Sequence, residues 1–123
     1  MKRILLIFLF LWANSCYYDN GETLYPELNS TCDLTSVTFT GSVKPILADN
    51  CLMCHSTASA GASGGGVKLE NFSDVSIYVS NNKLYGSILQ FSGFSPMPKG
   101  GNKLGSCALQ TIKKWIDNGA LNN

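Results

Sequence analysis

Five consecutive residues near the middle of the chain, Cys51-Leu52-Met53-Cys54-His55, constrain its fold and chemistry more than any other stretch. Two thiols three positions apart fall on one side of a single helical turn, and a histidine directly follows the second thiol. Three side chains that form covalent links or bind metals are therefore held within one turn of backbone. The rest of the chain must fold so that these three side chains can reach whatever they bind.

The pattern Cys-x-x-Cys-His is typical of the attachment site of a c-type haem. Its spacing has a chemical reason, because one helical turn presents both sulfurs to the two vinyl groups of the haem, where they form thioethers. The histidine beside the second link then lies under the iron and donates a ring nitrogen. We therefore predict that Cys51 and Cys54 bind one haem c covalently and that His55 is its proximal iron ligand.

Two other kinds of site use similar residues. A structural zinc site would combine Cys51, Cys54 and His55 with a fourth cysteine from elsewhere. A thioredoxin-like redox pair would use the two thiols alone, but it requires a βαβ context, and the flanking sequence has neither a strand pattern nor a parallel crossover.

The N-terminal stretch predicts export. Lys2 and Arg3 precede an apolar run over residues 4–12, so residues 1–15 resemble a secretory signal peptide that is too short to span a membrane. Residues 13–16 resemble the lipobox of bacterial lipoproteins, although Ala13 stands where leucine is usual. We expect lipidation of Cys16 and a bacterial membrane anchor facing the periplasm or cell surface. Plain cleavage and an uncleaved anchor are the alternatives.

Residues 16–36 are polar and aromatic without a helical or strand period, so we interpret them as a tether, with a partly ordered arm as the alternative. The domain proper is expected over residues 37–123. The cysteines left over from lipid and haem are Cys32 and Cys107, and two spare thiols in an oxidising compartment commonly form a disulfide. Two buried free thiols are the alternative.

Apolar residues recur at helical spacing in the domain, which predicts an all-α fold with helices over residues 42–52, 72–79, 83–91 and 107–118. Ser42 is the expected N-cap of the first helix. Gly93 and Gly119 are expected to end the last two helices. Trp115 is expected in the core against the first helix.

Two loops complete the pattern. Small residues over 56–66 let the backbone pass close to the haem without side-chain collisions. Met97 lies between Pro96 and Pro98, which favour extended backbone, so its thioether is expected to project from a stiff loop as the distal iron ligand. A gap-filling methionine is the alternative.

The order of these parts resembles a class I cytochrome c domain, and the resemblance covers about residues 37–121. It implies a small cytochrome c-type helical bundle around one covalently bound haem. By the same resemblance Cys51 and Cys54 are the haem links, His55 is the proximal ligand and Met97 is the distal ligand. The family pattern says nothing about a disulfide between Cys32 and Cys107.

We therefore expect a membrane-tethered mono-haem carrier of single electrons between redox partner proteins, with Lys99 and Lys103 as either partner contacts or ordinary solubilising lysines.

An enzyme is not expected. Peroxidase or oxygen chemistry needs a distal acid-base group, and residues 16–123 contain one histidine and no arginine. Without Lys2 and Arg3, seven of the nine basic residues remain against eight acidic ones, a net charge of −1. No basic stripe indicates nucleic-acid binding, and no small-molecule substrate is expected. A haem-based ligand sensor with a displaceable Met97 and a zinc-bound structural lipoprotein are the alternatives.

Overall fold

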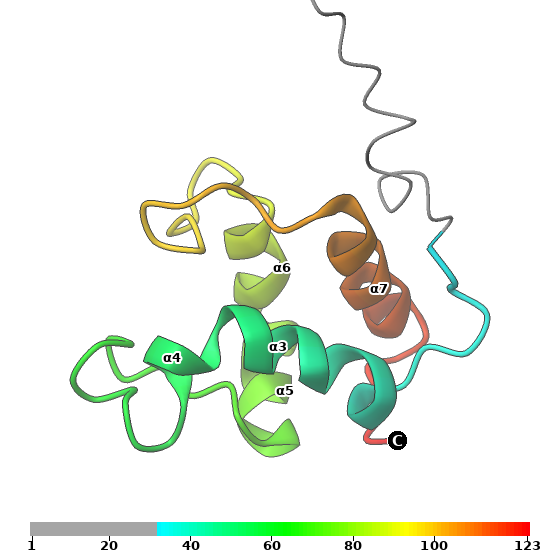
Figure 1. Ribbon diagram of the computed structural model, residues 1–123, viewed down its shortest axis with the longest axis horizontal. Helices are drawn as coiled ribbons and strands as arrows, with labels where there is room; N and C mark the ends of the chain where they lie inside the picture. The colour runs from blue at the N-terminus through cyan, green and yellow to red at the C-terminus, as the bar shows by residue number, and fades with distance from the viewer. Residues whose placement is uncertain (1–31) are drawn as a thin grey trace, which may run out of the picture. The chain divides into compact units, whose positions relative to one another are not determined.

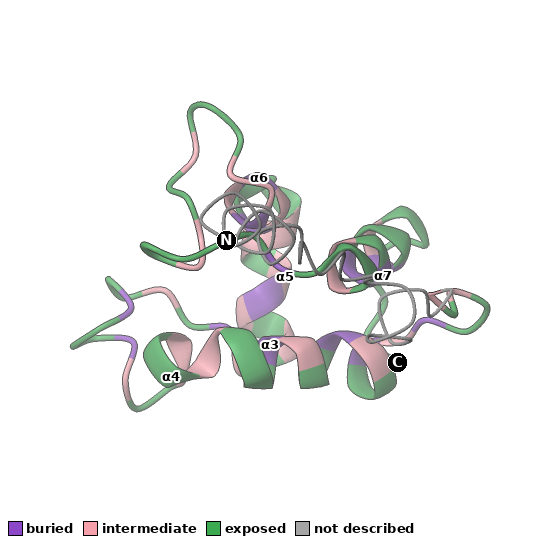
Figure 2. Cartoon of the chain, turned by 45° about the horizontal axis from the view of Figure 1, so that its top comes forward, coloured by how far each residue is buried: buried purple, intermediate pink, exposed green. Residues whose placement is uncertain are grey.

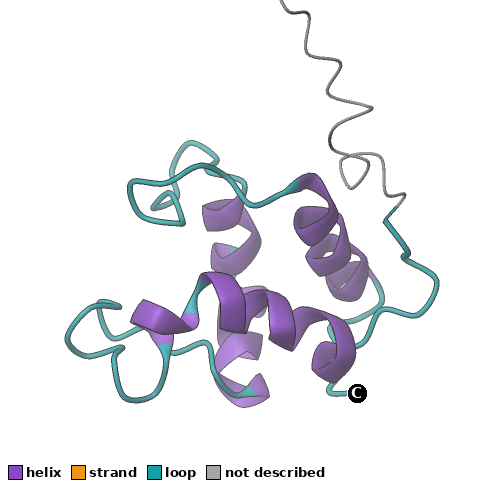
Figure 3. Cartoon of the chain, viewed as in Figure 1, coloured by secondary structure: helices purple, strands orange, loops and turns teal. Residues whose placement is uncertain are grey.

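The computed structural model describes residues 32–123. The predicted signal peptide, the lipidation site at Cys16 and the tether up to residue 31 lie outside the described residues. Every regular element in the described part is helical and no strand occurs there (Figure 3), so the predicted all-α class is confirmed at that level. Within residues 32–123, no helix is both long enough and apolar enough to cross a membrane.

Six helical elements follow one another along the chain (Figure 1). They are η2 (Phe39–Val43), α3 (Lys44–Asn50), α4 (Leu52–His55), α5 (Phe72–Ser80), α6 (Lys83–Ile88) and α7 (Ser106–Asp117).

The first predicted helix begins earlier than its sequence indicates, because Thr38 and not Ser42 is the N-cap. The Thr38 hydroxyl accepts a hydrogen bond from the Gly41 N–H, and the Thr38 N–H donates to the Ser42 hydroxyl at 3.3 Å. Ser42 therefore serves as the reciprocal partner of the cap. The π-helical turn η2 follows, and its wide hydrogen bonding accommodates Pro45, whose ring would collide with the carbonyl four residues earlier in a regular α-helix.

The later helices agree with prediction to different degrees. α5 ends one residue beyond the predicted boundary, and α7 is shifted by a single residue towards the N-terminus. Gly119, with φ 95°, ends α7 as predicted, and the N–H groups of Gly119 and Ala120 donate to the carbonyls of Ile116 and Trp115. The prediction was wrong for the end of α6, which is Ile88 and not Phe91, so Gly93 does not end this helix.

The core joins the beginning of the domain to its last helix. Trp115 is 1% exposed, and its ring centroid lies 5.5 Å from that of Phe39 in η2. Phe72 packs edge-on against Phe39, at a centroid distance of 5.2 Å. The Trp115 indole N–H donates to the Leu121 carbonyl at 2.9 Å, so the buried ring has its partner. The predicted core role of Trp115 against the first helical stretch is confirmed.

Burial decreases towards α4. Buried segments gather on α3, α5, α6 and α7, whereas α4 carries no buried residue (Figure 2). The core therefore supports the Cys-x-x-Cys-His turn from one side and leaves its other side exposed.

Candidate functional site

The Cys-x-x-Cys-His stretch forms one turn of backbone at the end of α3. The Cys51 N–H still donates to the Leu47 carbonyl at 2.8 Å, but Cys51 itself leaves the helical conformation, with φ −125°. Its carbonyl then accepts hydrogen bonds from the N–H groups of Cys54 (3.1 Å) and His55 (2.9 Å). This carbonyl closes the turn, so the two cysteines and the histidine come from one short piece of backbone.

The two thiols of this turn lie in different surroundings. Cys51 is half-buried against the core, Cys54 is exposed, and neither forms a disulfide in the structure. Burial raises the pKa of the Cys51 thiol to about 11 from its ordinary value of 9.0. A redox dithiol needs a lowered pKa at its attacking thiol, because the thiolate is the reactive form, so Cys51 is not suited to that role. No strand in the described residues supplies the βαβ context of a thioredoxin-like pair.

His55 has one ring nitrogen bound to the backbone. Its Nδ1 lies 2.9 Å from the Val67 carbonyl oxygen. Because a carbonyl can only accept, Nδ1 carries the hydrogen and donates it. In the neutral imidazole the other nitrogen, Nε2, then holds the lone pair, which is the form in which a histidine binds a metal.

The loop that brings Val67 to His55 passes very close to the motif. A Cβ on Gly64 would stand 2.4 Å from the Cys54 carbonyl oxygen and 2.9 Å from His55 Nδ1, so no side chain fits there. The Leu69 N–H donates to the His55 carbonyl at 2.9 Å, which fastens the far end of the loop to the same turn. Contact with the motif thus explains Gly64 among the small residues over 56–66, whereas Gly61, Gly65 and Gly66 have open space where a Cβ would stand.

Glu70 closes the base of this loop. Its Oε2 accepts a hydrogen bond from the Thr57 N–H at 2.7 Å. Hydrogen bonding from Thr57 holds the pKa of the Glu70 carboxyl below its usual range, so the carboxylate stays charged at neutral pH.

Met97 lies in an irregular loop between α6 and α7 and is half-buried. Its N–H donates to the Ser87 carbonyl at 3.0 Å, and its carbonyl accepts from Gln90 Nε2 at 3.4 Å. The ring of Phe94 rests on Gly86, where an added Cβ would come within 2.6 Å of the ring atoms. The Met97 loop is therefore fastened to α6 at several points.

Sequence analysis missed Gln90 and Gly86. A glycine inside a helix signals close approach of a neighbour, so Gly86 could have been recognised. Nothing in the local pattern marks Gln90, whose backbone is left-handed with φ 54°.

α4, which carries His55, and the loop that carries Met97 lie on the same side of the described unit. Both Figure 1 and Figure 2 show α4 with the following loop, and the loop between α6 and α7, on the side away from the C-terminus. Among the described residues, no hydrogen bond or ion pair joins Cys51, Cys54 or His55 to Met97.

The described residues offer no fourth ligand for a zinc site at Cys51, Cys54 and His55. No three His, Cys, Asp or Glu side chains in residues 32–123 are grouped so that they could hold a metal ion. Cys32 and Cys107 are bonded to each other, so neither is available to a site at Cys51 and Cys54.

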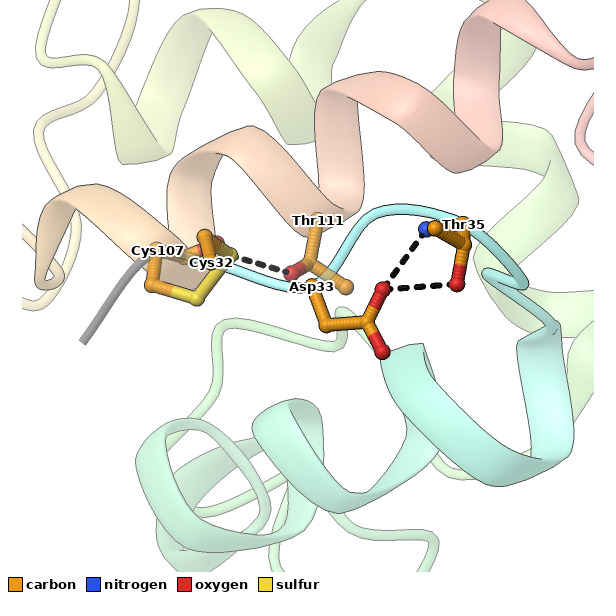
Figure 4. Close-up of a disulfide and its surroundings, with 5 residues drawn as sticks. All are labelled: Cys32, Asp33, Thr35, Cys107 and Thr111. Atoms are coloured by element: carbon orange, nitrogen blue, oxygen red, sulfur yellow. Dashed lines mark hydrogen bonds between the residues drawn. A yellow bond between two sulfur atoms is a disulfide. The ribbon is translucent and has the colours of Figure 1, made fainter.

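The disulfide joins Cys32 to Cys107 at the start of α7 across 75 positions of sequence, with the Cα atoms 5.3 Å apart (Figure 4). These are the two cysteines that were predicted to pair. Cys32 Sγ lies 3.6 Å from the Thr111 hydroxyl, which must be the donor because a disulfide sulfur carries no hydrogen. Asp33 accepts hydrogen bonds from the N–H and hydroxyl of Thr35 just after the link.

Comparisons with protein-family models, curated proteins and solved structures give no significant match to this chain.

Proposed function

We propose that residues 37–123 are a mono-haem c-type cytochrome domain that carries single electrons between redox partner proteins, on an exported chain anchored through lipid at Cys16. The observation that carries the proposal is the hydrogen bond from His55 Nδ1 to the Val67 carbonyl, made directly beside two unpaired thiols at Cys-x-x-Cys spacing.

That hydrogen bond is what a metal-binding histidine needs. Histidines that bind metals nearly always donate their second ring N–H to a carbonyl or carboxylate, which fixes the tautomer and the ring orientation. Gly64 and the Leu69 N–H hold the Val67 segment against the motif, and these contacts maintain the hydrogen bond from His55 to Val67. A surface histidine without such a role needs no dedicated loop around it.

The donor set also fits the group. Cys51 and Cys54 would hold the haem through thioethers, and His55 Nε2 and the Met97 thioether would be its iron ligands. When bound, the haem supplies reversible one-electron chemistry at its iron. The chain's own part is to hold both ligands at fixed places in both oxidation states and to keep water from the core side.

A second candidate is a ligand sensor in which Met97 is displaced. It is favoured by the irregular backbone of the Met97 loop and by the lengths of its Gln90 contacts, 3.4 and 3.2 Å. In such a protein a small ligand added at neutral pH would replace the methionine and change the visible spectrum, whereas an electron carrier would keep it.

The test is expression of the full chain in a host that attaches c-type haem. We expect the denatured protein to keep its haem in mass spectrometry, because thioethers survive unfolding, and to change its visible spectrum between the oxidised and reduced forms. The Cys51→Ala/Cys54→Ala variant is the control and should lose covalent haem. A wild-type mass equal to the bare polypeptide, with zinc recovered instead, would contradict the proposal.

Lys99 and Lys103, both exposed in the loop that carries Met97, are the proposed contacts for an acidic partner. Changing both to Glu should slow electron exchange with an acidic redox protein and weaken its dependence on salt. Lys83→Glu/Lys114→Glu makes the same change in net charge elsewhere on the domain and serves as control. Equal rates in both variants would identify Lys99 and Lys103 as ordinary solubilising lysines.

A further inference from the structure

The end of α6 holds Met97 by both of its backbone hydrogen-bonding groups. The Met97 N–H donates to the carbonyl of Ser87, and the Met97 carbonyl accepts from the side-chain amide of Gln90. The same amide nitrogen, Nε2, also donates to the Gly101 carbonyl at 3.2 Å. One side chain therefore connects two points of the loop, one at Met97 and one four residues later.

The chemistry of this contact is specific to an amide. A side-chain NH₂ group has two hydrogens and can serve two carbonyls at once. A carboxylate has no hydrogen to donate and would face two carbonyl oxygens. An apolar side chain of the same length would leave both carbonyls without this partner.

The backbone conformation of Gln90 brings its side chain within reach of the loop. Its φ of 54° lies in the left-handed region that residues other than glycine rarely adopt. The turn at Gln90 ends α6 before Gly93 and leaves the Gln90 side chain within reach of the loop. The N–H groups of Gln90 and Phe91 donate to the carbonyls of Ser87 and Gly86, both at 3.0 Å, so backbone hydrogen bonds at the end of α6 hold the left-handed turn and the side-chain amide remains available to the loop.

We propose that Gln90 is a positioning residue that fastens the Met97 loop and so sets how readily Met97 leaves its place. This inference rests on the proposed role of Met97 as the distal ligand, and it adds a residue that determines how easily added ligands compete with the methionine. Gln90 acts on the loop backbone and does not touch the thioether itself.

The experiment compares wild type with Gln90→Met, which keeps the side-chain length and removes the two donor hydrogens. Asn82→Met is the matched control, because it places the same side chain at the other left-handed position flanking α6, with φ 60° and no capping bond to lose. Two quantities are measured in the haem-loaded full chain. The first is the rate of hydrogen exchange at the Met97 N–H. The second is the affinity of imidazole for the iron, followed by loss of the thioether-to-iron band.

Loss of two neutral hydrogen bonds should open the loop about tenfold more often. We expect the Met97 N–H to exchange about tenfold faster in Gln90→Met and imidazole to bind about tenfold more tightly, with both unchanged in Asn82→Met. Wild-type values in Gln90→Met would overturn the inference, and so would equal changes in the two variants, which would indicate general destabilisation.

Failure of the proposed function is recognised separately, as wild-type protein without covalent haem. In that case the exchange rate at the Met97 N–H, which needs no iron, decides alone whether Gln90 holds the loop.

Discussion

Replacing Gly64 by alanine tests whether the loop around His55 is as close as the structure shows. The new Cβ would lie 2.4 Å from the Cys54 carbonyl oxygen, 2.9 Å from His55 Nδ1 and 3.0 Å from the Ala60 Cα. Two of these three neighbours are backbone atoms, so a simple side-chain rotation cannot relieve the contact. The loop must move away from the motif, and the hydrogen bond from His55 to Val67 must break.

The cost can be estimated from these two effects. Overpacking of this kind costs about 1–3 kcal/mol, and the lost hydrogen bond about 1 kcal/mol. Gly61→Ala is the matched control because it lies in the same loop with open space around its Cβ. Any glycine-to-alanine change restricts the unfolded chain similarly, by about 0.4–1 kcal/mol, so this term cancels between the two variants. Gly64→Ala should therefore be about 2–4 kcal/mol less stable than Gly61→Ala.

Urea unfolding of both variants measures this difference directly, and for a domain of this size it corresponds to roughly 10–30 °C in the thermal midpoint. The ¹⁵N chemical shifts of His55 provide a second measurement, because they report which ring nitrogen carries the hydrogen. Equal stability in the two variants, with Nδ1 still protonated in Gly64→Ala, would refute the close approach of the loop to the motif.

Three further outcomes are expected. Removing the Cys32–Cys107 disulfide by changing both residues to serine should lower the free energy of unfolding by up to about 4.5 kcal/mol, the chain-entropy value for a separation of 75. Label on either cysteine in unfolded, unreduced protein would show that the bond is absent. Met97→Ala should lose the thioether-to-iron band and lower the reduction potential, and an unchanged spectrum would show that Met97 is not the ligand. In chain made without haem, iodoacetamide at pH 8 should label exposed Cys54 before Cys51. At pH 8 a thiol of pKa about 11 holds about one hundredth of the thiolate held by a thiol at the ordinary value of 9.0, and the thiolate content of the Cys51 thiol rises about tenfold per pH unit. Equal labelling rates would show that Cys51 is not buried.

Elements with local signals were predictable from the sequence. The last helix has an apolar stripe around Trp115 and a glycine directly after its end, and the structure places it within one residue of the prediction. The pairing of Cys32 with Cys107 followed from counting cysteines. Both predictions depend on residues near each other in sequence or on chemistry that leaves few partners.

The early start of the first helical stretch involves a contact between residues far apart in sequence. Asn123 binds the start of η2, where its side-chain oxygen accepts from the Phe39 N–H and its backbone oxygen from the Thr40 N–H, both at 2.8 Å. These contacts satisfy donors that any helix start leaves free, and no local pattern reveals them. The end of α6 has a local cause, because the N–H groups of Gln90 and Phe91 donate to the carbonyls of Ser87 and Gly86 and close the helix around the left-handed residue Gln90.

The two candidate iron ligands are held by separate parts of the fold. His55 is held by the loop over residues 56–70, which contacts the motif turn at Leu52, Cys54 and His55 and places Leu69 in the core. Met97 depends on α6, which the core packs against α5 and α7. Because no hydrogen bond joins the two parts within residues 32–123, damage at Gly64 should leave the Met97 loop intact, and damage at Gln90 should leave the His55 tautomer intact. The candidate ligand His55 is thus held mainly by the loop that follows the motif, and the candidate ligand Met97 by contacts with the end of α6.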